Sequence, residues 1–278
     1  MSTTEASPDM DAFTDSRLTL KPRRRRTRSV SELGLGSDRP GGPLIAVGAL
    51  HGGTGATFLA HTLAAAVARE SSVPIVLADA SGQPGAMEAR CASTNPCGLG
   101  AISNLMATRQ PLPRPLYGSS DFRLRTICNP SSNPDVPPHP AALQHPTRGL
   151  LATLRANHGA TIVDCATVTS PLARAVMQAA DVALWTVNPT NAGIHSARII
   201  WGQHVASSPS ARVLVARERL GGPTPVKALR GLADAMGAAL LSVAHAPAAD
   251  RASTIEAITE TQIALTALAH RLPINVPA

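Results

Sequence analysis

The sequence predicts an α/β protein in which helices cover both faces of a mostly parallel β-sheet. From residue 43 onward, short apolar runs alternate with longer Ala-rich segments that have helical spacing. Most of these apolar runs are continuous, as expected for strands buried on both faces. Only 2% of the residues are aromatic, so the core must be aliphatic. The repeated alternation indicates a single doubly wound domain over residues 43–278.

The individual elements follow from the apolar runs and from the segments between them. Strands are expected at residues 44–48, 75–79, 123–127, 161–164, 182–187, 212–216 and 240–244. Helices are expected at residues 57–70, 98–108, 141–157, 171–179, 191–206, 225–236 and 251–271. Prolines crowd residues 111–140, which predicts an irregular, exposed excursion that serves as a binding loop or a spacer.

Residues 1–42 differ in composition from the rest of the chain and predict a disordered basic arm and linker. They hold 8 basic and 6 acidic groups, and six of the basic residues form one tract: Lys21, Arg23, Arg24, Arg25, Arg26 and Arg28. Such a tract is typical of a solvated arm, of a contact to DNA phosphates, or of a contact to an anionic membrane surface or protein partner.

Other features of the composition exclude several classes of protein. No apolar run approaches the roughly 18 residues of a membrane span, so no transmembrane segment is expected. The polar, acidic start is unlike a secretory signal. The four cysteines form no CxxC pair, which predicts free thiols in a reducing cytoplasm rather than a metal site.

A glycine-rich turn between the first expected strand and the first expected helix has the residues of a phosphate-binding loop. Glycines at 52, 53 and 55 permit positive φ, so that successive N–H groups converge on an anion. The Thr57 hydroxyl follows where it would meet a nucleotide-bound Mg²⁺. A tight turn without a ligand is the simpler alternative. The nucleotide-binding candidates are Gly52, Gly53, Thr54, Gly55, Ala56, Thr57 and Phe58.

Three blocks in order resemble the ParA/MinD superfamily of deviant Walker A, P-loop NTPases. Residues 51–57 (HGGTGAT) resemble its phosphate loop, residues 74–83 its second strand ending in DxDPQ, and residues 161–164 its Walker B strand. Residues 179–187 resemble a further strand of that family. The resemblance covers roughly residues 43–271. It implies binding of ATP or ADP, with Thr57, Asp79 and Asp164 around the Mg²⁺.

The departures from that family concern the residues that act on the phosphates. His51 replaces its signature lysine, Ala56 its Walker lysine, and Ser81 the acid that positions the attacking water. Phe58 replaces a second hydroxyl, and an adenine-reading Asn is replaced near residues 216–217. The resemblance therefore implies weak or vestigial nucleotide binding and little or no hydrolysis, with no catalytic residue assigned.

An alanine at the lysine position resembles the branch of CpaE/TadZ pilus-localisation proteins and septum-site-determining proteins. That branch implies a cytoplasmic homodimer with a protein partner, recruited to a pole, septum or membrane complex of a bacterial secretion, pilus, conjugation, division or partition assembly. Its members often carry a receiver-like N-terminal domain, whereas this chain has a basic arm. Two alternatives stay open: an active ATPase that obtains charge from Arg90 or Arg174 across a dimer, and a DNA-binding partition protein.

Overall fold

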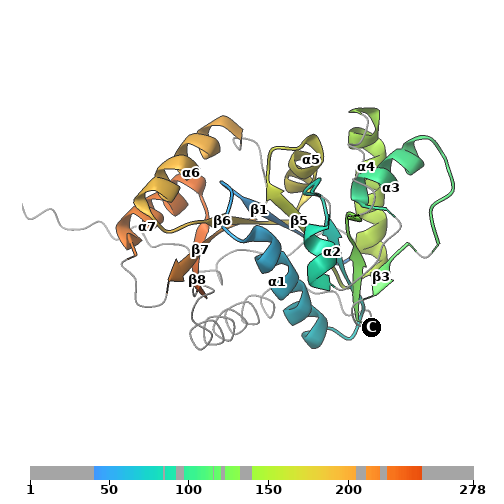
Figure 1. The fold of residues 1–278 in the computed structure, drawn as a ribbon, viewed down its shortest axis with the longest axis horizontal. Helices are drawn as coiled ribbons and strands as arrows, with labels where there is room; N and C mark the ends of the chain where they lie inside the picture. Colours follow the sequence, from blue (N-terminus) through green and yellow to red (C-terminus); the bar gives the residue numbers. More distant parts are fainter. Residues whose placement is uncertain are drawn as a thin grey trace, which may run out of the picture.

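A twisted eight-stranded sheet forms the centre of the molecule (Figure 1). The computed structural model describes residues 41–83, 85–91, 97–114, 116–119, 123–131, 140–204, 211–219 and 224–245. The strand order is β3-β4-β2-β5-β1-β6-β7-β8, and only β3 runs antiparallel to its neighbour within these residues. The strands are β1 (Leu44–Ala49), β2 (Ile75–Asp79), β3 (Gly118–Ser119), β4 (Leu124–Ile127), β5 (Ala160–Thr167), β6 (Val182–Val187), β7 (Ala211–Arg219) and β8 (Ala239–His245).

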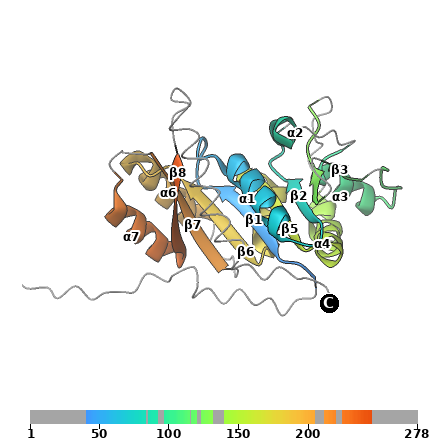
Figure 2. The same cartoon turned by 90° about the horizontal axis from the view of Figure 1, so that it is seen from below.

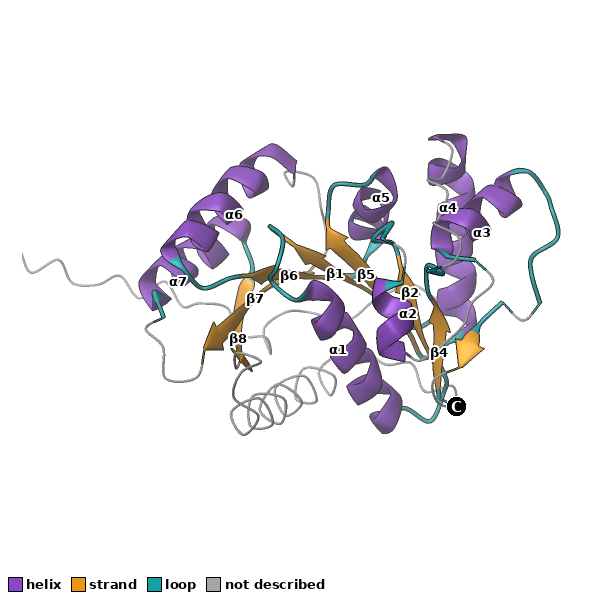
Figure 3. Ribbon diagram, viewed as in Figure 1, coloured by secondary structure: helices purple, strands orange, loops and turns teal. Residues whose placement is uncertain are grey.

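Helices cover both faces of this sheet, as the secondary-structure colouring in Figure 3 shows. They are α1 (Ala56–Glu70), α2 (Ala86–Cys91), α3 (Leu99–Ala107), α4 (Pro140–Asn157), α5 (Pro171–Ala179), α6 (Asn191–His204) and α7 (Val226–Met236). Helices α1 and α2 lie on one face, and α3 to α7 lie on the other (Figures 1 and 2). None of the described helices is long and apolar enough to cross a bilayer.

Alternate residues of the central strands supply two separate hydrophobic cores. In β1, Leu44 and Ala46 pack with residues of α3 to α7, whereas Ile45 and Val47 pack with residues of α1 and α2. All six residues of β1 are buried. Successive side chains of a strand point to opposite faces, so a strand with a helical layer on each side is apolar at every position. This explains the continuous apolar runs of the sequence.

The predicted α/β fold, with a mostly parallel sheet and helices on both faces, is confirmed. Each predicted strand lies at or within about three residues of an observed one. Strand β3 and helix α2 were not predicted, because two and six residues respectively are too short to show a period. The predicted helix over residues 251–271 and most of the basic arm lie outside the described residues.

The connections bring the predicted site residues to one edge of the sheet. From β1 the chain passes through α1 to β2, which is separated from β1 by β5, and β5 later connects through α5 to β6 on the other side of β1. The direction of winding therefore changes at β1. In open parallel sheets, ligands bind outside the carboxyl ends of strands at such a switch point. The carboxyl ends of β1, β2 and β5 are therefore the place to look for a site.

Candidate functional site

The turn between β1 and α1 has the backbone of an anion-binding loop. Gly53 and Gly55 have φ values of 77° and 80°, in the left-handed region that favours glycine. Gly52 and Gly53 are exposed, and Gly55 is the N-cap of α1 without a side-chain capping bond. The first N–H groups of α1 therefore lack side-chain partners from the cap, which suits an anion at the positive end of the helix dipole.

The side chains of Thr54 and His51 connect the loop to β6 and to the residue that follows it by hydrogen bonds. The Thr186 hydroxyl donates to the Gly48 carbonyl at 3.2 Å, so the Thr54 hydroxyl is the donor in the 2.6 Å bond between Thr54 Oγ1 and Thr186 Oγ1. His51 Nδ1 lies 3.1 Å from the Gly52 carbonyl, and its Nε2 accepts from the Asn188 N–H at 3.3 Å. These contacts hold the His51 ring between the loop and the residue that follows β6.

Asp79 and Asp164 lie side by side at the carboxyl ends of β2 and β5, where they are register partners. Their exposed fractions are 0% and 1%. Asp79 Oδ1 accepts from the Ser81 N–H at 2.8 Å, and Asp164 Oδ1 accepts from the Ala166 N–H at 2.9 Å. The second carboxylate oxygen of each is buried without a hydrogen-bond partner. The two carboxylates are thus held close together, and each has one oxygen without a hydrogen-bond partner.

Burial and proximity both disfavour the charged forms of these carboxyls. Burial, followed by the neighbouring Asp164, raises the pKa of Asp79 to about 7. Burial also raises the pKa of Asp164, and the Thr57 hydroxyl partly opposes this rise. Thr57 therefore faces the Asp164 carboxylate from the first turn of α1. The predicted magnesium residues Thr57, Asp79 and Asp164 form one cluster at the end of the phosphate loop.

A backbone irregularity shapes the end of β5 at this cluster. The pairing of β1 with β5 shifts register between Val47 and Gly48, opposite the step from Asp164 to Ala166. Ala166 has a φ of 42°, which is unusual for a residue with a Cβ. Strained backbone of this kind costs about 1–3 kcal/mol and is concentrated at functional sites. Here the bulge turns the Ala166 N–H onto the Asp164 carboxylate.

The cluster fits a Mg²⁺ that is bound together with a nucleotide. Mg²⁺ prefers oxygen ligands, and protein sites often supply one or two carboxylates while phosphates and waters complete the octahedron. The two carboxylate oxygens without partners and the Thr57 hydroxyl meet that requirement. No group of three or more His, Cys, Asp or Glu residues suited to a metal occurs in the described part of the chain.

Two arginines beside the loop lie against the ring of Phe58. The guanidinium of Arg217, from β7, is centred 5.0 Å from the Phe58 ring, and that of Arg90, from α2, is centred 5.8 Å from it. Arg217 Nη1 also donates to the Thr54 carbonyl at 3.3 Å. Sequence reasoning treated Arg217 only as a missing asparagine. Its contact to the loop could not be read from a strand 163 residues further along the chain.

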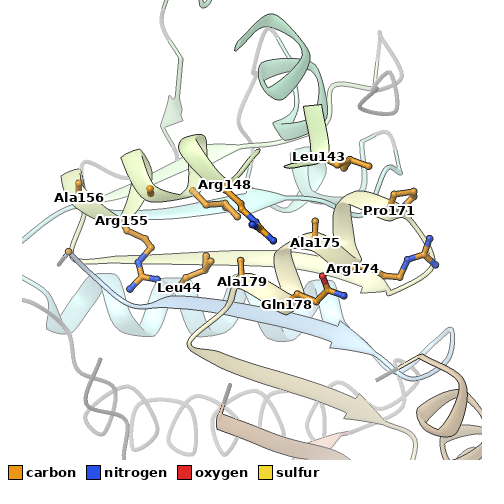
Figure 4. Close-up of a pocket in the computed structure, with 13 residues that line it drawn as sticks. Leu44, Leu143, Arg148, Arg155, Ala156, Pro171, Arg174, Ala175, Gln178 and Ala179 are labelled. Atoms are coloured by element: carbon orange, nitrogen blue, oxygen red, sulfur yellow. The ribbon is translucent and has the colours of Figure 1, made fainter. Parts of the chain in front are cut away.

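Arg174, the other arginine considered as a source of charge, lies on α5. It lines a groove of about 1080 Å³ between α4 and α5, together with Arg148 and Arg155 (Figure 4). None of the residues predicted to bind the nucleotide lines this groove. Within one chain, Arg90 contacts the loop residue Phe58, whereas Arg174 lines the groove between α4 and α5.

Ser81 and Asn129 complete the polar surroundings of Asp79. The Ser81 hydroxyl accepts from the Gln83 N–H at 3.1 Å, so this residue organises the turn after β2. The nearby Asn129 backbone lowers the pKa of Asp79 and so partly opposes the effect of burial, and both polar atoms of the buried Asn129 side chain lack hydrogen-bond partners. Asn129 was not predicted. Its position two residues after an expected strand, at the same sheet edge as Asp79, was the available signal.

Comparison with solved structures identifies the fold. A ParA-family ATPase from Chlorobium tepidum matches with a TM-score of 0.60 and 14% identity, covering 84% of this chain and 95% of that one. A chain of the MinC:MinD cell division protein complex of Aquifex aeolicus matches with a TM-score of 0.60 and 17% identity, covering 84% of this chain and 97% of that one. MinD from Pyrococcus horikoshii, solved with Mg-ADP, matches with a TM-score of 0.56 and 15% identity, covering 82% and 95%.

These matches define a class of protein with the ParA/MinD-type P-loop fold. The chain has this ParA/MinD-like fold, as its sequence motifs predicted. No protein-family model and no curated protein sequence matches the chain.

Proposed function

We propose that this protein binds a magnesium nucleotide, ATP or ADP, in a ParA/MinD-like site and uses it for localisation or regulation with little or no hydrolysis. The observation that carries this proposal is the cluster of Thr57, Asp79 and Asp164 at the end of the phosphate loop. Its two buried carboxylate oxygens without partners would be costly without a cation. Bound Mg²⁺ would neutralise phosphate charge, and the loop N–H groups from Gly52 to Phe58 would hold the phosphates.

The residues found at the two positions that would act on the phosphates, Ala56 and Ser81, support weak hydrolysis. Ala56 is 5% exposed and packs into the core on the α1 and α2 face, so it presents no charge to the loop. Ser81 carries no carboxylate and organises the turn after β2. Phosphoryl transfer depends on charge placed along the transition state, and these replacements remove a cation and a water-positioning acid.

A role in positioning, carried out as a homodimer with a protein partner, is the function that best suits a site with these losses. The similar MinD from Aquifex aeolicus was solved as a complex with MinC, and a similar chain from Borrelia burgdorferi is a plasmid partition protein. A nucleotide that is held but rarely hydrolysed can stabilise one conformation or one dimer without turnover. We assign to this protein a cytoplasmic location with recruitment to a larger assembly.

Calorimetry with ATP and ADP, with and without Mg²⁺, tests this proposal together with a turnover assay. We expect Mg²⁺-dependent binding that is weakened at least tenfold by Thr57→Ala and by Asp164→Asn. The matched control is Thr108→Ala, at an exposed threonine that follows α3. Absence of nucleotide binding by the folded wild-type chain would overturn the proposal. Turnover that is abolished in Asp164→Asn would replace it with an active ATPase.

An active ATPase is the second candidate, because two cations do lie at the loop. Arg90 and Arg217 both lie against the ring of Phe58, which follows Thr57 directly. If either guanidinium stabilises the transition state, turnover will fall in the corresponding alanine variant. The two candidate functions thus differ in the rate of ATP hydrolysis and share one nucleotide-binding site.

A further inference from the structure

Arg217 brings a positive charge to the part of the loop where the lysine is missing. Its Nη1 donates to the Thr54 carbonyl at 3.3 Å. A Cβ built on Gly55 would collide with that same Nη1, so the guanidinium lies directly against Gly55. Gly55 immediately precedes Ala56. The glycine therefore serves two purposes here, because it permits the positive φ of 80° and leaves space for the guanidinium.

The contacts of Arg217 hold its guanidinium in place. The Phe58 ring lies under it at 5.0 Å, and the hydrogen bond to Thr54 fixes one end of the planar group. Stacking on an aromatic face is a preferred arrangement for arginine, and a held guanidinium gives up little further freedom when it binds an anion. Burial followed by the charge of Arg90 lowers the pKa of Arg217. Arginine nevertheless stays protonated in proteins.

The balance of charge at the site favours an anion beside these arginines. Arg90 faces the same Phe58 ring from α2, so two cations lie against one aromatic side chain. The two carboxylates of Asp79 and Asp164 are matched by the charge of one Mg²⁺. A polyphosphate that binds with that ion brings additional negative charge, and the two guanidinium groups are placed to compensate it.

We propose that Arg217 is the phosphate-binding cation of this site and takes the electrostatic role of the missing loop lysine within the same chain. Its ligand is the polyphosphate of a magnesium nucleoside di- or triphosphate, with Phe58 as the platform and Arg90 as a second, more distant charge. This inference rests on the proposed function. The inference goes beyond the proposed function because it names Arg217 as the residue that binds the phosphates. It also requires no arginine from a dimer partner.

The test compares ATP and ADP affinities of wild type, Arg217→Ala and Arg217→Lys by calorimetry in Mg²⁺. A charge-assisted hydrogen bond corresponds to a change of about 10- to 150-fold in affinity, which is the loss expected for Arg217→Ala. Arg217→Lys keeps the charge and should retain part of the affinity. The matched control is Arg212→Ala on the same strand, because Arg212 stacks on Trp201 at 5.3 Å and bonds to Met236 instead of the loop.

A rescue experiment separates the electrostatic role from a structural one. The double variant Arg217→Ala with Ala56→Lys places the positive charge at the usual lysine position, and it should regain affinity relative to Arg217→Ala. Thermal unfolding of each variant without nucleotide shows whether it is folded. If the double variant does not fold, the comparison of Arg217→Ala with Arg217→Lys and Arg212→Ala decides.

The outcomes distinguish this inference from the proposed function. If wild type binds nucleotide and folded Arg217→Ala binds equally well, the inference is wrong and the proposed function stands. If wild type does not bind, the proposed function itself fails. An affinity that depends on protein concentration, and is absent in the monomer, would point instead to a charge from a second chain.

Discussion

At the scale of single residues, the site sacrifices stability for the ability to bind a cation. Asp79 and Asp164 are neighbours in the sheet register, are almost completely buried, and each retains an oxygen without a partner. Like charges in a shared, desolvated position destabilise the ionised pair. By contrast, Asp181, which is also an acid at a strand terminus, forms a 2.9 Å ion pair with Arg155. The difference marks the first pair as functional and the second as structural.

We therefore predict that Asp79→Asn stabilises the nucleotide-free protein at pH 8 while it removes Mg²⁺-dependent nucleotide binding. The gain should be about 1–2 kcal/mol, because removal of one charge relieves the repulsion and Asn can still accept from the Ser81 N–H. Urea unfolding without Mg²⁺ measures it. The control Asp181→Asn removes a paired charge and should destabilise. A lower urea midpoint for Asp79→Asn would contradict the assignment of this carboxylate to a cation site.

At the scale of elements, the buried Arg155–Asp181 pair joins three parts of the fold. Arg155, from the last turn of α4, donates its Nε to the Gly42 carbonyl at 3.1 Å and pairs with Asp181 at 2.9 Å. Asp181 also accepts from the Leu44 N–H at 2.9 Å. The start of β1, the end of α4 and the turn before β6 are thus fixed to one another. This fixes the amino end of the strand whose other end carries the phosphate loop.

Replacement of Arg155 by Met should destabilise the protein by about 1–3 kcal/mol, because it removes the ionic partner of the partly buried Asp181 and the donor to the Gly42 carbonyl. The measurement is the urea midpoint at pH 7.5. Arg148→Met is the matched control: Arg148 lies on the same helix, lines the same groove and is exposed (Figure 4). Equal shifts of the urea midpoint in the two variants would show that the Arg155–Asp181 pair stabilises the protein no more than an exposed arginine does.

How far the sequence predicts these elements depends on whether a feature is local. The strand–glycine turn–helix around residues 44–70 is local, so its position and the positive φ of Gly53 and Gly55 follow from residue type. Asp79 and Asp164 were implied by the resemblance of residues 74–83 and 161–164 to ParA/MinD strands, and the two acids meet as register partners of parallel strands. Arg217, Arg90 and Asn129 reach the site through strand order and side-chain packing. Their roles could not be derived from spacing along the chain.

At the scale of the whole molecule, positive charge is distributed over two parts with different expected roles. The chain has a net charge of +7, and six of its basic residues fall within residues 21–28. In the described domain, several arginines are engaged by aromatic rings or by Asp181. Residues 21–28 include no acidic or aromatic residue, and such a dense tract of Arg is suited to phosphate groups in a row.

We expect the full chain to be retained weakly on duplex DNA, with a retention that falls steeply as salt rises. Replacement of all six basic residues of the tract by Gln should lower the slope of log K against log salt by about 0.9 for each phosphate that the variant no longer neutralises. Fluorescence anisotropy with a labelled duplex measures this slope, and calorimetry should show unchanged nucleotide binding.

A control with the same reduction of charge decides whether the tract or the net charge is responsible for this retention. It replaces six exposed basic residues of the described domain by Gln: Arg109, Arg114, Arg148, Arg198, Lys227 and Arg230. Equal weakening in both variants would assign the binding to net charge, and unchanged retention in the tract variant would exclude DNA contact through the arm. Binding of the tract to vesicles containing anionic lipid, in the absence of DNA binding, would assign it to a membrane surface. A tract that acts on DNA would lower retention far more than the control, because its charges are close enough in sequence to follow one phosphate backbone.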